Sequence, residues 1–234
     1  MQISHDARSV ATRTDDPTVY QRQVDDSFVP LKVSPRGRER FVAELSGTEA
    51  DGVVFTEVSS SPQLVERNAE SIARGGSGYY KVSLLLAGSS ILIQDGREIV
   101  MKPGDISFYD TSRPYSLLFD EQFRNLIMML PKDRLDFPSS LTDSLTAVSL
   151  GDQHPLANAV ASFITQASPQ LGRLSELART KLAHSSLELL STMLSAVLDV
   201  ETTARSPRQL LLHQIHAYIG ANLASPELGP ASIA

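Results

Sequence analysis

The chain has 234 residues, of which 41% are hydrophobic and 21% are charged, and its formal net charge is −6. This length suffices for one large or two small domains with a buried core. The negative charge excludes a protein whose whole surface coats nucleic acid, because neutralising phosphates requires clustered Lys and Arg. The sequence contains no cysteine, which excludes disulfides, thiolate nucleophiles and cysteine-ligated zinc.

The first forty residues are polar, with turn signals at Asp15-Asp16-Pro17 and Ser34-Pro35. We interpret residues 1–40 as an N-terminal extension that includes a short amphipathic helix near residues 20–28. The start of the chain lacks the apolar run of a secretory signal, and apolar runs such as residues 126–130 are too short to cross a bilayer. We therefore expect a cytoplasmic protein without a membrane partner.

From residue 41 the pattern changes to short β-rich runs separated by Gly, Pro and Asp. Many short strands at close spacing predict a sandwich or barrel. Asp95-Gly96 predicts a type I′ hairpin, and Pro103-Gly104 predicts a type II turn. The expected strands cover residues 53–58, 79–86, 90–93, 98–101, 106–109, 115–119 and 123–130.

From about residue 151 the apolar spacing becomes helical. Residues 154–164 form the first expected helix, with Asp152 as its cap and Pro155 in its first turn. Ser168-Pro169 ends it, and a second, longer helix is expected from about residue 174 to residue 198. The polar segment 201–207 indicates a linker.

The last thirty residues begin with an amphipathic segment, residues 207–223, which by itself is compatible with an ordinary packing helix. A turn that contains Pro230 follows it. The apolar and polar positions of this region resemble the opening of the DNA-binding domain of AraC/XylS-family transcription regulators. The matching residues are Tyr218-Ile219, Asn222-Leu223, Leu228, Pro230 and Ile233-Ala234.

The middle of the chain resembles the sensory domain of the same family, a small cupin-like β-barrel, over much of residues 53–131. The matching positions are Arg67, Tyr79-Tyr80, residues 84–88, residues 94–97, Pro103-Gly104-Asp105, residues 109–115 and Leu130-Pro131.

The resemblance implies an α+β fold: a small cupin-like (jelly-roll) β-barrel, then an α-helical dimerisation segment, then the first helix of a helix-turn-helix domain. The implied parts are the extension 1–40, the sensory barrel 41–150, the helical segment and linker 151–204, and an incomplete DNA-binding domain 205–234. The recognition helix would lie beyond Ala234. We therefore expect DNA contact only through a part that this sequence lacks, and the DNA-contacting residues are unknown.

Strand position and the resemblance suggest five residues for binding a small-molecule effector inside the barrel. An inward-facing Arg suits a carboxylate, so we expect an organic or aromatic acid. Alternatively, Arg113 forms a surface salt bridge and Tyr109 belongs to the core. The ligand-binding candidates are Arg67, Tyr80, Gln94, Tyr109 and Arg113.

In the resembled family, helices after the barrel commonly form a dimer, so we expect a homodimer through the long helix. Alternatively, the same side chains pack only on their own barrel. The dimer-interface candidates are Leu182, Leu189, Leu190, Met193 and Val197.

Metal-dependent cupins hold their ion with strand-borne His and Glu side chains. No histidine lies between residues 41 and 130, so we expect no metal, no cofactor and no enzyme activity. The alternative function is a stand-alone cupin-like small-molecule-binding protein or a metal-independent isomerase.

Overall fold

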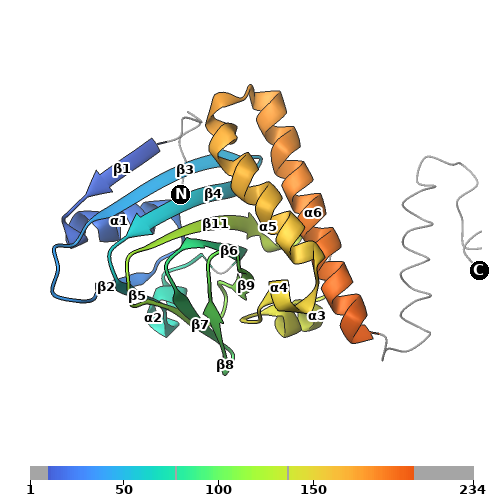
Figure 1. Cartoon of the computed structure of the whole chain (residues 1–234), viewed down its shortest axis with the longest axis horizontal. Helices are drawn as coiled ribbons and strands as arrows, with labels where there is room; N and C mark the ends of the chain where they lie inside the picture. The colour runs from blue at the N-terminus through green and yellow to red at the C-terminus, as the bar shows by residue number, and fades with distance from the viewer. Residues whose placement is uncertain (1–9, 77, 136, 203–234) are drawn as a thin grey trace, which may run out of the picture. The chain divides into compact units, whose positions relative to one another are not determined.

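Two antiparallel β-sheets face each other at the centre of the fold (Figure 1). The computed structural model describes residues 10–76, 78–135 and 137–202. The six-stranded sheet has the order β1-β3-β4-β11-β6-β9, and the five-stranded sheet has the order β2-β5-β10-β7-β8. The strands are β1 (Val10–Thr14), β2 (Lys32–Pro35), β3 (Ala43–Ala50), β4 (Val53–Ser60), β5 (Gln63–Arg67), β6 (Tyr79–Ala87), β7 (Ser90–Gln94), β8 (Arg97–Met101), β9 (Ile106–Asp110), β10 (Tyr115–Phe119) and β11 (Phe123–Pro131).

The predicted α+β class is confirmed, as a cupin-like pair of sheets followed by helices. All seven predicted strands are present, with bounds that differ by at most two residues. Strands β1, β2, β3 and β5 were not predicted. In β3, Glu and Ser alternate weakly with small apolar residues, so no clear two-residue period marks it.

Both predicted turns are confirmed. Asp95 and Gly96 have φ of 55° and 72°, as a type I′ turn requires. Gly104 has φ of 97°, and the Asp105 N–H donates to the Lys102 carbonyl at 2.9 Å, which closes the second turn.

Residues 10–40, which we predicted to belong to an extension, contribute elements to both sheets. Strand β1 pairs with β3, and β2 pairs with β5. Between them lies helix α1 (Pro17–Ser27), which begins at Asp16 because the Asp16 carboxylate accepts from the Thr18 N–H at 2.7 Å. The predicted short helix is therefore present, and it packs into the core through Tyr20 and Val24.

The remaining helices follow the strands or connect them. Within the described residues, none is long and apolar enough to cross a membrane. They are α2 (Ala69–Ala73), the 3₁₀ helix η1 (Lys132–Arg134), α3 (Ser139–Leu145), α4 (Leu150–Gln153), α5 (Leu156–Ala167), the 3₁₀ helix η2 (Ser168–Arg173) and α6 (Glu176–Thr202).

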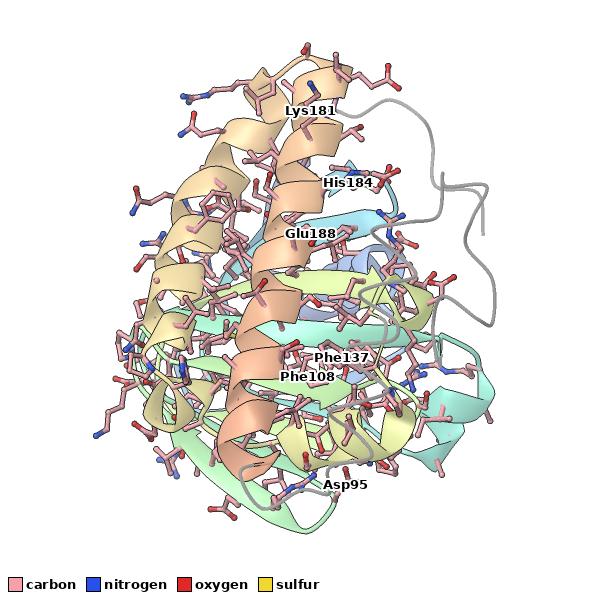
Figure 2. All side chains as sticks on the ribbon, turned by 90° about the vertical axis from the view of Figure 1, so that its right-hand side faces the viewer. Asp95, Phe108, Phe137, Lys181, His184 and Glu188 are labelled. Carbon is pink, nitrogen blue, oxygen red and sulfur yellow. The ribbon has the colours of Figure 1, made fainter. Side chains whose placement is uncertain are left out.

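Both predicted long helices are present as α5 and α6, and they lie side by side over the outer face of the six-stranded sheet (Figures 1 and 2). The predicted cap of α5 is wrong. Asp152 lies inside the short helix α4, and the His154 ring accepts from the Leu156 N–H at 3.1 Å instead. The predicted DNA-binding segment 205–234 and most of the predicted linker lie outside the described residues.

The centre of the six-stranded sheet is consequently buried on both faces. Its inner face contributes Leu85 and Ile127 to the core between the sheets. Phe108 lies behind α6 in Figure 2 and is 0% exposed. A strand such as β6 is therefore buried on both sides, so any polar side chain on it needs a partner inside the protein.

Candidate functional site

A narrow cavity lies between the two sheets, and α1 forms part of its wall. Its volume is about 40 Å³, which is room for roughly three waters. Most of the lining side chains are apolar, as is usual for sites that take small organic molecules. The polar side chains that reach it are Tyr20, Gln63, Lys81, Tyr109, Tyr115 and Asn125.

Strand register brings the central polar groups together. Lys81 on β6 lies directly opposite Tyr109 on β9, so both side chains point from the same face of the six-stranded sheet. Tyr115 approaches from β10 in the other sheet, and its ring meets the Tyr109 ring edge-on at 4.8 Å. The cavity is thus the place where polar groups of both sheets converge.

Lys81 is the one lysine among the described residues that line the cavity, and it is only 2% exposed. Its Nζ donates to the Tyr115 hydroxyl at 3.2 Å and lies 4.4 Å from the centre of the Phe28 ring. Burial, with a smaller contribution from the positive charge of Arg67, lowers the pKa of Lys81 from 10.5 to about 7.

None of the described residues that line the cavity is an aspartate or a glutamate. A buried ammonium group normally has a carboxylate partner. Here the amine meets a phenol and aromatic rings instead. A ligand that brings a negative charge or another group that can bond to nitrogen would supply the missing partner.

The three tyrosines of the cavity remain neutral hydrogen-bonding groups. Burial raises the pKa of Tyr20 to about 12, and burial also raises the pKa values of Tyr109 and Tyr115 well above 10. The Gln63 amide donates to the Tyr20 hydroxyl at 3.1 Å, which ties α1 to β5. At neutral pH each hydroxyl can therefore donate a proton to a ligand oxygen.

Of the five predicted ligand-binding residues, Tyr109 lines this cavity. Arg67 is 1% exposed, and its guanidinium donates to backbone carbonyls instead. The accepting carbonyls belong to Pro30, Ser71, Gly75 and Thr111, at 2.6 to 3.1 Å. Arg67 therefore joins three segments, around Pro30, around α2 and around Thr111, and its charge reaches the cavity only through space.

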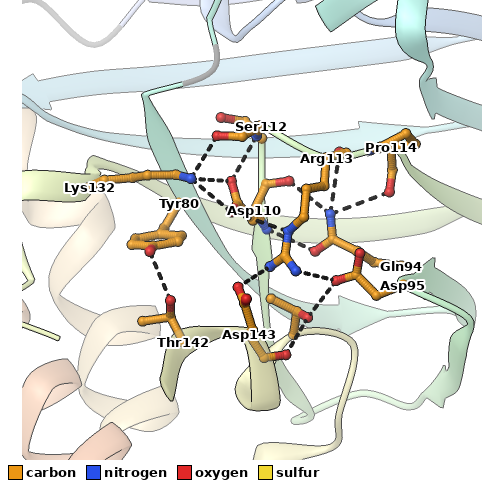
Figure 3. A network of polar contacts seen from close by, with 12 residues as sticks. Tyr80, Gln94, Asp95, Asp110, Ser112, Arg113, Pro114, Lys132, Thr142 and Asp143 are labelled. Carbon is orange, nitrogen blue, oxygen red and sulfur yellow. Dashed lines mark hydrogen bonds and ion pairs between the residues drawn. The ribbon is translucent and has the colours of Figure 1, made fainter. Parts of the chain in front are cut away.

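Gln94 and Arg113 meet in a second polar cluster at the end of β9, which Figure 3 shows. The Gln94 amide holds the backbone of Asp110 on both sides, accepting from its N–H at 2.9 Å and donating to its carbonyl at 2.8 Å. Arg113 pairs with Asp95 at 2.8 Å and with Asp143 at 3.0 Å. The salt-bridge alternative for Arg113 is therefore the one observed.

Tyr80 points to the opposite face of β6 from Lys81. Its hydroxyl is 2.9 Å from the Thr142 hydroxyl on α3 (Figure 3). Its ring packs on the Phe108 ring, with 4.8 Å between the ring centres. Tyr80 thus joins the sheet to the helices that follow it, away from the cavity.

The predicted dimer residues are largely packed inside the single chain. Leu190 and Met193 are 0% exposed and Val197 is 2% exposed, whereas Leu182 and Leu189 are half-buried. The exposed side of α6 carries polar residues instead, among them Lys181, His184 and Glu188 (Figure 2). This burial favours the alternative that these side chains pack on their own chain.

Sequence reasoning missed Lys81, Tyr115, Gln63 and Asn125. Lys81 did carry a signal, because it is the charged residue within the apolar run of β6, whose residues from Tyr80 to Leu85 are all buried. A charge in a strand that is buried on both faces indicates a functional or paired group.

A model of the AraC-binding-like domain matches residues 20–195, which is most of the chain and includes every residue of the cavity. The chain belongs to the AraC-binding-like domain family.

Two curated relatives match this AraC-binding-like domain over most of its length. One is an uncharacterised protein in a nit 5′ region of Bacillus sp. strain OxB-1, 28% identical over 90% of this chain and 83% of its own length. The other is the transcriptional activator NphR of Rhodococcus sp., 23% identical over 86% of this chain. The chain spans 60% of the length of NphR.

The fold of the AraC-binding-like domain is also similar to the crystal structure of the AraC-like transcriptional activator CuxR. The TM-score is 0.69 at 20% identity, and the match covers 96% of this chain and 82% of the other. At that level of identity the similarity shows the shared fold.

Proposed function

We propose that this chain is the sensory part of an AraC/XylS-type transcription regulator, and that its effector binds between the two sheets at Lys81. The observation that carries the proposal is a buried amine in a mostly apolar cavity whose described lining holds no carboxylate. The family supports a regulatory role over a catalytic one.

The chemistry of the cavity favours a small organic acid as effector. A carboxylate would accept a charge-assisted hydrogen bond from Lys81 and a second bond from a tyrosine hydroxyl, and its apolar part would contact the aromatic lining. An organic acid was also expected from the sequence. The residue that we propose to bind its carboxylate is now Lys81 and not an inward-facing Arg.

Size distinguishes between kinds of acid. The cavity of about 40 Å³ is smaller than an acid of either kind needs, since an aromatic ring alone needs on the order of 150 Å³. An aromatic acid would therefore require the wall formed by Tyr20, Val24 and Phe28 of α1 to move outward. A short aliphatic acid requires a smaller movement of the same wall.

Dimerisation and DNA binding belong to the same proposal. In an intact regulator, effector binding would shift the balance between two arrangements of paired DNA-binding domains. Since Leu190, Met193 and Val197 are buried in the single chain, a homodimer would have to use other parts of α6, such as Leu177, which is 66% exposed. Equilibrium sedimentation of the pure chain tests this part, and a monomer at tens of micromolar would contradict it.

A thermal-shift comparison tests the effector site. Propionate and benzoate are compared with the uncharged propionamide and benzamide, on wild type, Lys81→Met and the matched surface variant Lys32→Met. Lys32 is exposed, with 62% of its side chain in solvent. A ligand at a hundred times its dissociation constant stabilises the folded state by about 2.7 kcal/mol.

We expect a carboxylate to raise the melting temperature of wild type and of Lys32→Met, and to have little effect on Lys81→Met. Equal stabilisation by the amides, or a response that survives in Lys81→Met, would contradict the proposed site.

A further inference from the structure

We propose that Lys81 also captures small aldehydes as a reversible imine, which would let this cavity respond to a carbonyl compound as well as to an acid. The inference rests on the proposed effector site, because it uses the same cavity. An imine is a covalent bond between Lys81 and the ligand, whereas an acid would form only an ion pair with Lys81.

The Lys81 amine lies in the wall of the cavity that a small aldehyde would occupy. The Lys81 Nζ faces a cavity whose other lining groups are apolar side chains, phenols and amides. No described lining residue could hold the nitrogen permanently as a carboxylate ion pair. The cavity of about 40 Å³ also matches a small aldehyde better than a bulky one.

Burial, and to a smaller extent the positive charge of Arg67, keeps part of Lys81 in the neutral form, and none of the described groups that face it carries a negative charge. They are Tyr20 on α1, Tyr109 on β9 and Tyr115 on β10, all neutral at pH 7, and the fixed positive charge of Arg67 on β5. With a pKa of about 7, roughly half of Lys81 is a free amine at neutral pH, against about one part in three thousand for an ordinary lysine. The free amine is the nucleophile that attacks carbonyl carbon.

The reaction balances without an oxidant or a reductant. Nζ forms a bond to the carbonyl carbon while the C=O π electrons move to oxygen, which takes up a proton. Water then leaves as the C–O bond breaks and the C=N bond forms, so that both amine hydrogens depart with the oxygen. The Tyr115 hydroxyl, 3.2 Å from Nζ, is placed to pass a proton between nitrogen and oxygen.

The experiment is reductive trapping of the full chain with propanal and cyanoborohydride, followed by peptide mapping. At pH 7 we expect a propyl group to appear on Lys81 on the order of tenfold faster, or more, than on the exposed Lys32, because roughly half of Lys81 is a free amine at that pH. Raising the pH to 9 should speed the labelling of Lys81 by only about twofold, because this amine is already half deprotonated at pH 7. Uniform labelling of the surface lysines with Lys81 unmodified would overturn the proposal.

A competition arm separates this inference from the proposed function. If propionate stabilises the chain but Lys81 is not labelled, the imine is refuted and the acid site stands. If Lys81 is labelled selectively and propionate does not slow the labelling, the imine stands and the acid site is refuted. We expect labelling that propionate slows, and Lys81→Met should lose the fast site while keeping the fold.

Discussion

Replacing Lys81 by Met should make the protein more stable at neutral pH, by an amount that depends on pH. The pKa of Lys81 is about 7 in the folded chain, against an ordinary value of 10.5. Between these values the unfolded chain binds the proton and the folded chain does not. Stability of the wild type therefore rises with pH across this window.

The expected size follows from the two pKa values. The slope approaches about 1.4 kcal/mol per pH unit, and because Lys81 is half-titrated at pH 7, the wild type gains about 2 kcal/mol between pH 7 and pH 9. Lys81→Met lacks this gain, since Met has no proton to lose and fills much of the same volume. At pH 7 the variant should therefore be the more stable protein, and its advantage should shrink toward pH 9.

Urea unfolding at both pH values measures this difference directly. The matched variant Lys32→Met should follow the pH dependence of the wild type, because Lys32 is exposed. If the free-energy difference between wild type and Lys81→Met is the same at pH 7 and pH 9, the buried amine does not titrate as described and the reasoning fails.

Four further substitutions test other parts of the structure, each by urea unfolding. Arg67→Met should destabilise by about 3 to 5 kcal/mol, because it leaves buried carbonyls without their donor; a loss below 1 kcal/mol would contradict its fastening role. Asp110→Asn removes the carboxylate that pairs with the Lys132 ammonium at 2.7 Å. It should lower the free energy of unfolding by about 2 kcal/mol, and by less at high salt. Gly88→Ala should cost more than about 2 kcal/mol, because φ is +81° and the new Cβ would lie 2.6 Å from a backbone carbonyl. Gly104→Ala, with φ of +97° and open space, should cost only about 1 kcal/mol, and equal losses would refute the steric argument.

The central strands and turns could be predicted because their signals are local. Strand β6 is an apolar run. Asp95-Gly96 tolerates the positive φ angles that both central residues of a type I′ hairpin turn need. Strand β3 was missed because its outward side chains are polar and its pairing with β4 depends on contacts between distant parts of the sequence.

The site was harder to predict than the fold, because a residue type does not reveal its partner. Arg67 and Gln94 lie at the ends of β5 and β7, yet their polar groups bind backbone carbonyls and hold loops in place. Lys81 was overlooked because a lysine on a strand usually faces solvent, and only the two-sided burial of β6 makes it exceptional. Burial of a strand on both faces depends on the segments that pack against it, so it cannot be read from the sequence of the strand alone.

The most direct test of the effector site is a crystal structure of the chain with the acid that gives the largest thermal shift. The account predicts ligand density between the two sheets, with the carboxylate within hydrogen-bond distance of the Lys81 Nζ and the Tyr115 hydroxyl. Density at another place on the chain, with the cavity unchanged and Lys81 still bonded only as described, would contradict it.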